Sequence, residues 1–198
     1  MAVSPQTSNT PNNRFQPTSA EAGRQAQINF MTTPRLKFEI ATTDRLKIDD
    51  SEILDLLTQV YVGGGFTTSE EAVSLFEPTA VRARGILIGA RESQQSKLAG
   101  FIIVVPPDSP ARRLAKNNEA ELHLLGVKPE YRQHGLGRML VDAAIENTSR
   151  LGCSKLILWT QLSMSSAQRL YESAGFVHTS NIERNGREFK LYERALCA

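Results

Sequence analysis

The stretch VKPEYRQHGLGRML, which begins at Val127, places two glycines between basic side chains just before an amphipathic segment. Gly135 and Gly137 allow the backbone to approach a ligand closely and to adopt positive φ values. The amides of such a turn have no partner inside the following helix, and the helix dipole favours an anion there. Arg132 and Arg138 flank the glycines and add positive charge. The segment therefore predicts a turn that binds a pyrophosphate.

Two other phosphate-binding loops fit this segment less well. A Walker loop requires a Gly-Lys pair, and the sequence contains none. A dinucleotide-binding fingerprint requires a third glycine three residues after the second, where this chain has Leu140. A plain strand-to-helix turn stays open as an alternative, because G-x-G alone is weak evidence.

Apolar spacing predicts the elements that position the turn. Alternating or continuous apolar runs predict strands at 36–42, 85–92, 97–107, 119–127, 155–160, 176–180 and 188–194. Helical spacing predicts helices at 49–62, 68–78, 136–151 and 165–175. Asp50 or Ser51 would cap the first helix, and Thr68 or Ser69 the second, with Pro78 beyond its end. This order favours an α/β fold with a mostly antiparallel sheet in its first half.

The composition indicates one domain preceded by a tail. Residues 1–34 are rich in Ser, Thr, Asn, Gln and Pro and predict a disordered N-terminal tail before a domain at 35–198. The formal net charge is only +2, so no overall field directs the protein to nucleic acid or to an anionic membrane. Neither Cys153 nor Cys197 has zinc-site spacing, and no apolar run reaches the roughly 20 residues that cross a bilayer. We expect a cytoplasmic protein without a metal ion.

Two segments resemble the signatures of the GNAT superfamily of N-acetyltransferases. From Arg132 onward the pattern R-x-x-G-x-G resembles the cofactor-binding signature, and SAQRLYESAGF, downstream, resembles the second signature. The resemblance covers roughly residues 36–196. It implies a GNAT-like acyltransferase fold, with a mixed and mostly antiparallel sheet flanked by about four helices. It also implies direct transfer of an acetyl group from acetyl-CoA to a primary amine of a small molecule or protein, and many relatives are homodimers.

The resemblance also implies which residues hold the co-substrate. The cofactor-binding positions that it assigns are Leu125, Val127, Arg132, Gln133, His134, Gly135, Leu136, Gly137, Arg138 and Ser166. The chain departs from the pattern at Met164, where many members carry Asn. A contact to the pantetheine arm is then missing or comes from Ser165 or Ser166.

Glu121 is the expected general base. Period-two alternation places it on the same strand face as His123 and Leu125. It lies eleven residues before Arg132, as does the catalytic glutamate of the histone-type members relative to their signature. Its apolar neighbours Leu122 and Leu124 predict a raised pKa, which suits a base. Glu119 and His123 are reserve candidates.

The resemblance implies two further catalytic groups. A backbone amide within Leu125–Val127 would stabilise the oxyanion beside a bulge, which Gly126 would tolerate. Tyr171 matches the family tyrosine that reaches the sulfur of CoA, and a phenol can donate a proton to a leaving thiolate. Trp159 is expected in the core.

The acceptor amine is not identified by the sequence. In this superfamily the loop between the first two helices and the last hairpin select it, and here Glu70, Glu71 and Glu183 could attract a cation or could simply cap helices. Two alternatives to the enzyme are a non-catalytic acyl-CoA-binding sensor and, more weakly, a protein that uses the turn for ATP.

Overall fold

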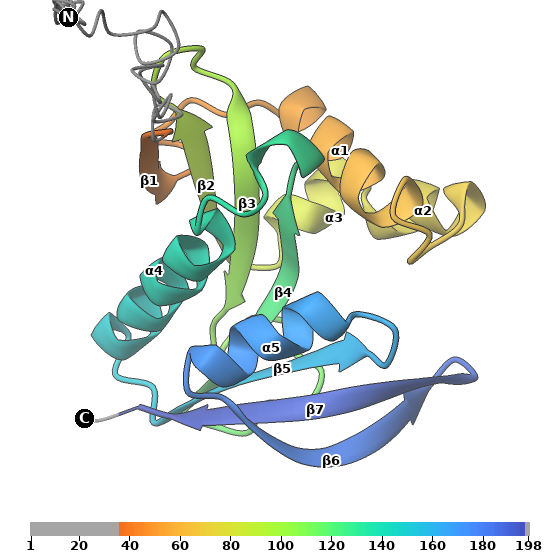
Figure 1. Cartoon of the computed structure of the whole chain (residues 1–198). Helices are drawn as coiled ribbons and strands as arrows, with labels where there is room; N and C mark the ends of the chain where they lie inside the picture. Colours follow the sequence, from red (N-terminus) through yellow and green to blue (C-terminus); the bar gives the residue numbers. More distant parts are fainter. Residues whose placement is uncertain (1–35, 197–198) are drawn as a thin grey trace, which may run out of the picture. The chain divides into compact units, whose positions relative to one another are not determined.

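A seven-stranded sheet runs through residues 36–196, the part of the chain that the computed structural model describes, in the order β1-β2-β3-β4-β5-β7-β6 (Figure 1). The predicted tail at 1–34 lies outside these residues. The strands are β1 Phe38–Thr42, β2 Ile86–Glu92, β3 Leu98–Val105, β4 Glu119–Val127, β5 Lys155–Gln161, β6 Val177–Arg184 and β7 Arg187–Ala195. Only β4 and β5 pair in parallel. The predicted mixed and mostly antiparallel sheet is confirmed.

Five α-helices cover the sheet within the described residues, one more than the sequence predicts. They are α1 Asp50–Leu57, α2 Ser69–Leu75, α3 Pro78–Arg82, α4 Leu136–Arg150 and α5 Ser165–Ser173, with a π-helical turn η1 Thr58–Val62 and a 3-10 turn η2 Pro129–Tyr131. The extra helix is α3, which begins at Pro78 because Glu77 caps it and proline suits a first helical turn. None of the described helices has the length and apolarity to cross a bilayer.

Asp49 caps α1, so the predicted caps Asp50 and Ser51 are wrong by one or two positions. The Asp49 carboxylate accepts a hydrogen bond from the Glu52 amide, and the Glu52 carboxylate accepts one from the Asp49 amide. This reciprocal capping box requires an acid three residues after the cap, and Asp49 is the residue that satisfies that spacing. Thr68 caps α2 in the same way, as predicted.

The sheet separates two hydrophobic cores. In β3, which is buried along its whole length, Ile102 and Val104 face α4, whereas Phe101, Ile103 and Val105 face α1. Figure 1 shows α4 on one side of β1–β4 and α1 to α3 on the other, with α5 over β5. The candidate active site lies near the point where strands β4 and β5 diverge.

The parallel pair β4–β5 opens after only three residue pairs, the last of which is Glu121 with Ile157. Beyond that point β5 stays paired with β7 over its full length, while β4 stays paired with β3. The two halves of the sheet therefore diverge, as Figure 1 shows, and the C-terminal half of β4 has no neighbour on its β5 side.

A bulge in β4 lies at Leu124 and not at Gly126 as expected. Leu124 has a φ of 50°, and the register with β3 shifts there. Gly126 instead allows close packing, because a Cβ at that position would lie 2.7 Å from the Leu56 side chain in α1. The bulge also reverses the alternation, so Leu125 packs on the α4 side and not on the face predicted for it with Glu121.

Candidate active site

The glycine turn before α4 has an open anion-binding geometry. Gly135 is the N-cap of α4 and has a φ of 78°, and a Cβ added there would meet no atom within 4 Å. Gln133 also has a positive φ, of 64°. Gly137 serves packing as well, since a Cβ there would lie 3.1 Å from the Leu170 side chain of α5. The Leu136 side chain is buried, so only its backbone can face a ligand at the turn.

The two arginines beside the turn differ in their contacts. Arg132 is exposed and donates to the Val127 carbonyl over 3.2 Å. Arg138 binds both carboxylate oxygens of Asp142, at 2.9 and 3.0 Å, and donates to the Ser173 carbonyl. Arg138 thus joins α4 to α5, and Arg132 is the flanking cation that lacks a carboxylate partner among the described residues.

The unpaired edge of β4 presents backbone amides beside this turn. The Lys128 amide donates to the Ala99 carbonyl in β3. Because backbone groups alternate in an antiparallel pair, the N–H and C=O groups of Gly126 then point toward β3, and those of Leu125 and Val127 point away from it. The Leu125 carbonyl accepts a hydrogen bond from the Tyr61 hydroxyl at 3.0 Å, and the Val127 carbonyl accepts from Arg132. The amides of Leu125 and Val127 face the gap between β4 and β5.

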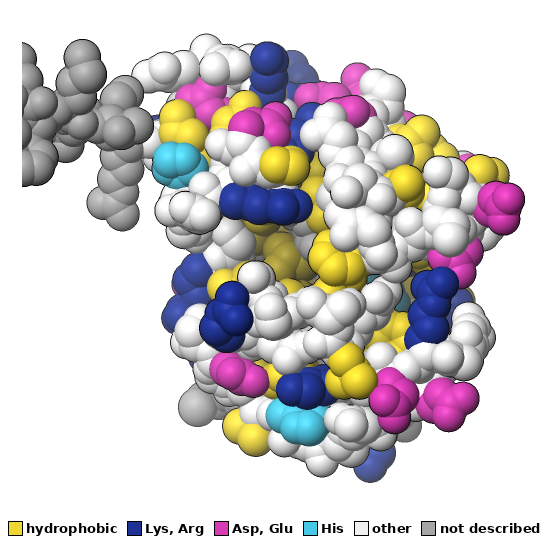
Figure 2. All heavy atoms as spheres, turned by 45° about the vertical axis from the view of Figure 1, so that its right-hand side comes forward, with side chains coloured by type: hydrophobic (Ala, Val, Ile, Leu, Met, Phe, Trp, Pro, Cys, Tyr) yellow, Lys and Arg dark blue, Asp and Glu magenta, His cyan; other side chains and the backbone are white. Residues whose placement is uncertain are grey.

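A cavity of about 810 Å³ opens at that gap, and residues of η1, α2, β4, β5 and α5 are among those that line it. Leu125, Arg132, Ser166 and Tyr171 line it, so the structure brings these predicted site residues together. Figure 2 shows this side of the molecule hollowed, with hydrophobic side chains in the hollow and Lys or Arg side chains at its rim. The exposed residues Gln133 and His134 lie on the surface beside the cavity.

Glu121 does not line the cavity, and the prediction of a raised pKa is wrong. Its side chain is fully buried, and one carboxylate oxygen accepts hydrogen bonds from the amides of Arg113, Leu114 and Ala115. The other oxygen lies 2.8 Å from His123 Nε2. Burial alone would raise the pKa of Glu121, but these hydrogen bonds outweigh it and lower the pKa to about 2. Glu121 is therefore an ionised, fully bonded carboxylate without access to a substrate.

His123 stands between Glu121 and the cavity. Because Glu121 is ionised, the ring nitrogen that faces it, Nε2, carries a proton, and Nδ1 holds the lone pair of the neutral ring. Nδ1 has no partner among the described residues, and no buried side-chain nitrogen lacks one, so Nδ1 is accessible from the cavity that His123 lines. Burial lowers the pKa of His123 despite Glu121 beside it. Of the two side chains, the reserve candidate His123 is therefore the one with a lone pair accessible from the cavity.

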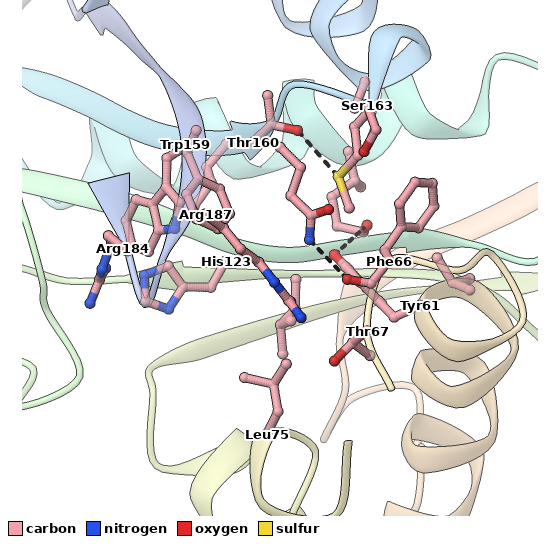
Figure 3. A pocket seen from close by; sticks show the side chains of 18 of the residues that line it. Tyr61, Phe66, Thr67, Leu75, His123, Trp159, Thr160, Ser163, Arg184 and Arg187 are labelled. Carbon is pink, nitrogen blue, oxygen red and sulfur yellow. Dashed lines mark hydrogen bonds between the residues drawn. The ribbon is translucent and has the colours of Figure 1, made fainter. Parts of the chain in front are cut away.

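His123 is held by aromatic packing as well. Its ring packs edge-to-face with the Trp159 ring, with the centroids 5.0 Å apart, and Arg184 Cζ lies over the indole 5.2 Å from the ring centroid. Figure 3 shows Arg184, Trp159 and His123 together on one side of the pocket, facing Tyr61, Phe66 and Thr67. Trp159 lines the cavity, so its predicted place in the core is wrong. Strand alternation puts it on the face of β5 opposite Leu158, which does lie in the core.

Tyr171 projects from α5 into the same cavity. Burial raises its pKa, and its hydroxyl has no hydrogen-bond partner among the described residues. Met164, at the position where a family asparagine was expected, caps α5 without a side-chain bond to the helix. Its sulfur instead accepts a hydrogen bond from the Thr160 hydroxyl at 3.3 Å. Ser166 remains exposed beside it, with its hydroxyl bonded to Arg169.

The family of the chain follows from comparison with known proteins. A model of the acetyltransferase (GNAT) family matches residues 51–176, more than half of the chain. The chain belongs to the GNAT family. The matched span contains β4, the glycine turn, α4 and α5, which are the elements that bear both expected signatures of this GNAT domain.

The relatives of this GNAT domain differ in what they acetylate. The chain is 34% identical over 116 residues to mycothiol acetyltransferase of Kocuria rhizophila, which covers 57% of this chain and 34% of that protein. It is 38% identical over 68 residues to ribosomal protein bS18 alanine N-acetyltransferase of Escherichia coli, covering 34% of this chain and 45% of that protein. Both relatives are thus matched over less than half of their own length.

The fold of solved GNAT structures agrees with the arrangement described above. An acetyltransferase from Bacillus subtilis, solved in complex with CoA, superposes with a TM-score of 0.57 at 21% identity over 82% of this chain and 99% of that chain. This likeness supports the GNAT architecture of the sheet and helices.

The acids that could have attracted a cation do not give the cavity a free carboxylate. Glu71 lines it, but its carboxylate binds Thr67, the Thr68 amide and Arg187. Glu70 and Glu183 are exposed and do not line it. Sequence reasoning missed Tyr61 and four arginines that line the cavity, Arg84, Arg113, Arg184 and Arg187. Tyr61 ends a helical segment predicted for its apolar spacing alone, and nothing local distinguishes those arginines from other surface arginines.

Proposed function

We propose that this protein is an acetyl-CoA-dependent N-acetyltransferase, acting in the cytoplasm, that transfers an acetyl group directly to a primary amine of a small molecule or protein. The observation that carries the proposal is the His123–Glu121 pair, in which His123 lines the cavity near the point where β4 and β5 diverge. A sensor that only binds acyl-CoA would not need a neutral, buried base beside the cleft. The chain's membership of the GNAT family supports the same reaction.

Acetyl-CoA would lie across the turn and along β4. The amides at the start of α4 and Arg132 would bind the pyrophosphate, because unpaired amides and the helix dipole both favour an anion there. The pantetheine arm would pair with the Val127 amide and pass Ser166. The thioester would then reach the part of the cavity between Tyr171 and His123.

The transfer forms a C–N bond and an S–H bond and breaks a C–S bond and an N–H bond. The neutral amine attacks the thioester carbonyl, the C–N bond forms, and the C–S bond breaks to release CoA. His123 Nδ1 takes the proton that the amine loses, and the ionised Glu121 stabilises the resulting imidazolium without accepting the proton itself. Tyr171, whose raised pKa keeps it protonated, donates its proton to the departing thiolate.

The oxyanion would be met by the backbone of β4. The Leu125 amide faces the gap just after the bulge at Leu124, and the Tyr61 hydroxyl fixes the same peptide segment through the Leu125 carbonyl. A single fixed donor of this kind contributes roughly 3 kcal/mol to lowering a barrier. Tyr61 would act as a positioning residue in this arrangement.

The test is release of free CoA thiol from acetyl-CoA with a broad panel of primary amines, together with calorimetric binding of acetyl-CoA. We expect amine-dependent thiol release that falls sharply in His123→Asn and binding that persists in that variant. Tight binding of acetyl-CoA without turnover on any amine would instead support the sensor.

A further inference from the structure

We propose that the acceptor is a small primary amine that also carries an anionic group, a carboxylate or a phosphate, bound by Arg84, Arg113 and Arg184. This inference rests on the proposed N-acetyltransferase function and names the substrate class of the same site. The sequence left the acceptor unidentified and offered Glu70, Glu71 and Glu183 only as groups that could attract a cation or cap helices.

The first argument is the charge of the part of the cavity beyond His123, which we call the acceptor half. Its charged side chains come from α2, from the segment before β2, from the loop before β4 and from the β6–β7 hairpin. They are Arg84, Arg113, Arg184, Arg187 and Glu71. Four arginines against one glutamate give the acceptor half a strongly positive character although the whole chain is nearly neutral. Such a local field attracts anions.

The second argument is that most of these arginines have no carboxylate partner among the described residues. Arg187 pairs with Glu71 at 2.8 Å and so is satisfied. Among the described residues, Arg84, Arg113 and Arg184 form no ion pair with a carboxylate. The nearest buried acid, Glu121, already accepts three backbone amides and His123. The three remaining guanidinium groups therefore lack a counter-charge.

Arg84 bears an electrostatic cost that an anionic ligand would relieve. The side chain is half-buried, and one of its nitrogens donates to the Leu75 carbonyl at 2.7 Å. Burial lowers the pKa of Arg84. Tyr61 opposes this effect, and repulsion from Arg113 adds a smaller contribution in the same direction as burial. Removing part of a charge from water without a compensating partner is costly, so an anion beside the half-buried Arg84 would be favourable.

Arg184 offers a flat guanidinium in a fixed orientation. It lies over the Trp159 ring at 5.2 Å, which leaves its edge nitrogens for a carboxylate or phosphate. Trp159 in turn contacts His123, so an anion at Arg184 would place its amine near the base. Figure 3 shows Arg184 and His123 adjacent, and Arg187 extending across the pocket toward Thr67. The Arg187–Glu71 link narrows the site and favours a small acceptor.

The kinetic test compares matched amines that differ only in the anion. β-Alanine is compared with β-alaninamide, and O-phosphoethanolamine with ethanolamine, after correction for the fraction of neutral amine at the assay pH. We expect kcat/KM to be at least about tenfold higher for one or both of the anionic members. The two pairs distinguish a carboxylate from a phosphate.

Matched variants connect the preference to the arginines. Arg113→Gln and Arg184→Gln should each lower kcat/KM for the anionic amine by about tenfold or more and leave the neutral partner nearly unchanged. Arg112→Gln is the control, because Arg112 adjoins Arg113 but bonds to Lys116 and Asn117 outside the cavity. This variant should behave as wild type.

A binding measurement does not depend on turnover. Trp159 is the single tryptophan of the chain and lies beside Arg184, so its fluorescence reports on this half of the cavity. With the enzyme saturated by CoA to fill the pyrophosphate site, β-alanine or inorganic phosphate should change the fluorescence with a saturable dependence. Arg113→Gln should weaken that binding, and Arg112→Gln should not.

The outcomes separate the two proposals. Equal kcat/KM within both amine pairs, with no Arg113-dependent fluorescence change, would overturn the anion site and leave the N-acetyltransferase intact. Saturable anion binding that Arg113→Gln weakens, with no acetyl transfer to any amine, would refute the transfer reaction and support the anion site.

Discussion

Replacing Glu121 by Gln should destabilise the protein at neutral pH and abolish part of its sensitivity to acid. In the folded protein the pKa of Glu121 falls from 4.5 to about 2. A carboxyl group whose pKa is lowered by folding stabilises the fold above its unfolded pKa, and this contribution is lost as the pH falls through the folded value. The relevant window therefore runs from about pH 5 down to about pH 2.

The magnitude follows from the same values. Each unit of difference between the folded and the unfolded pKa corresponds to about 1.4 kcal/mol, so the ionised Glu121 contributes about 3 kcal/mol at pH 7. That is a large part of the 5–15 kcal/mol by which domains are usually stable. Glutamine keeps one carbonyl oxygen for the amides of residues 113–115 but loses the charge that these amides and His123 share.

Urea unfolding followed by far-UV circular dichroism at pH 7, 5 and 3 measures this effect. Wild type should exceed Glu121→Gln by about 3 kcal/mol at pH 7, and the difference should shrink as the pH approaches 3. Glu119→Gln is the control, since Glu119 lies on the same strand but binds the Lys116 amide and Lys155. That variant should retain the steep acid dependence. A Glu121→Gln deficit that is the same at pH 7 and pH 3 would refute the reasoning.

Three further predictions concern the site. His123→Asn should lower kcat by about 10²–10⁴-fold and leave the Kd of acetyl-CoA, measured by calorimetry, unchanged. Because burial lowers the pKa of His123, kcat/KM of the wild type should decrease toward acidic pH only below pH 6.5, and this decrease should be absent in the variant. Gly135→Val should abolish acetyl-CoA binding in calorimetry, whereas Gly152→Val, which imposes a comparable left-handed strain at a φ of 72° past the other end of α4, should retain it; equal losses in both would point to strain alone. Tyr171→Phe should lower kcat severalfold with little change in acetyl-CoA affinity, and an unchanged kcat would remove the proposed acid.

Local patterns were sufficient to predict the seven strands and four of the helices in their order along the chain. Apolar periodicity located β1 to β7, and the positive φ of Gly152 and Gly175 after α4 and α5 agrees with the predicted helix ends. The extra helix α3 was not predicted, because Pro78 both follows one helix and begins the next. Proline alone does not distinguish these two positions.

The site was less predictable because its chemistry depends on contacts between distant segments. Alternation placed Glu121 and His123 on one face, and their hydrogen bond confirms it. Which of them reaches the cavity is decided by the loop at 111–115, whose amides enclose Glu121, and no periodicity encodes that contact. The arginines of the acceptor half converge from three separate segments for the same reason.

The bulge at Leu124 has a consequence for how this domain can vary. Upstream of it, His123 points to the side where the amine would enter, and downstream the amides of Leu125 and Val127 would serve the co-substrate. This continuous segment of β4 thus fixes the position of His123 relative to the amides of Leu125 and Val127. Removing or adding a single residue between Glu121 and Val127 would turn one set of groups to the wrong side of the sheet while leaving the other in place. Changes of length should therefore be tolerated in the surrounding loops and excluded from this short piece of strand.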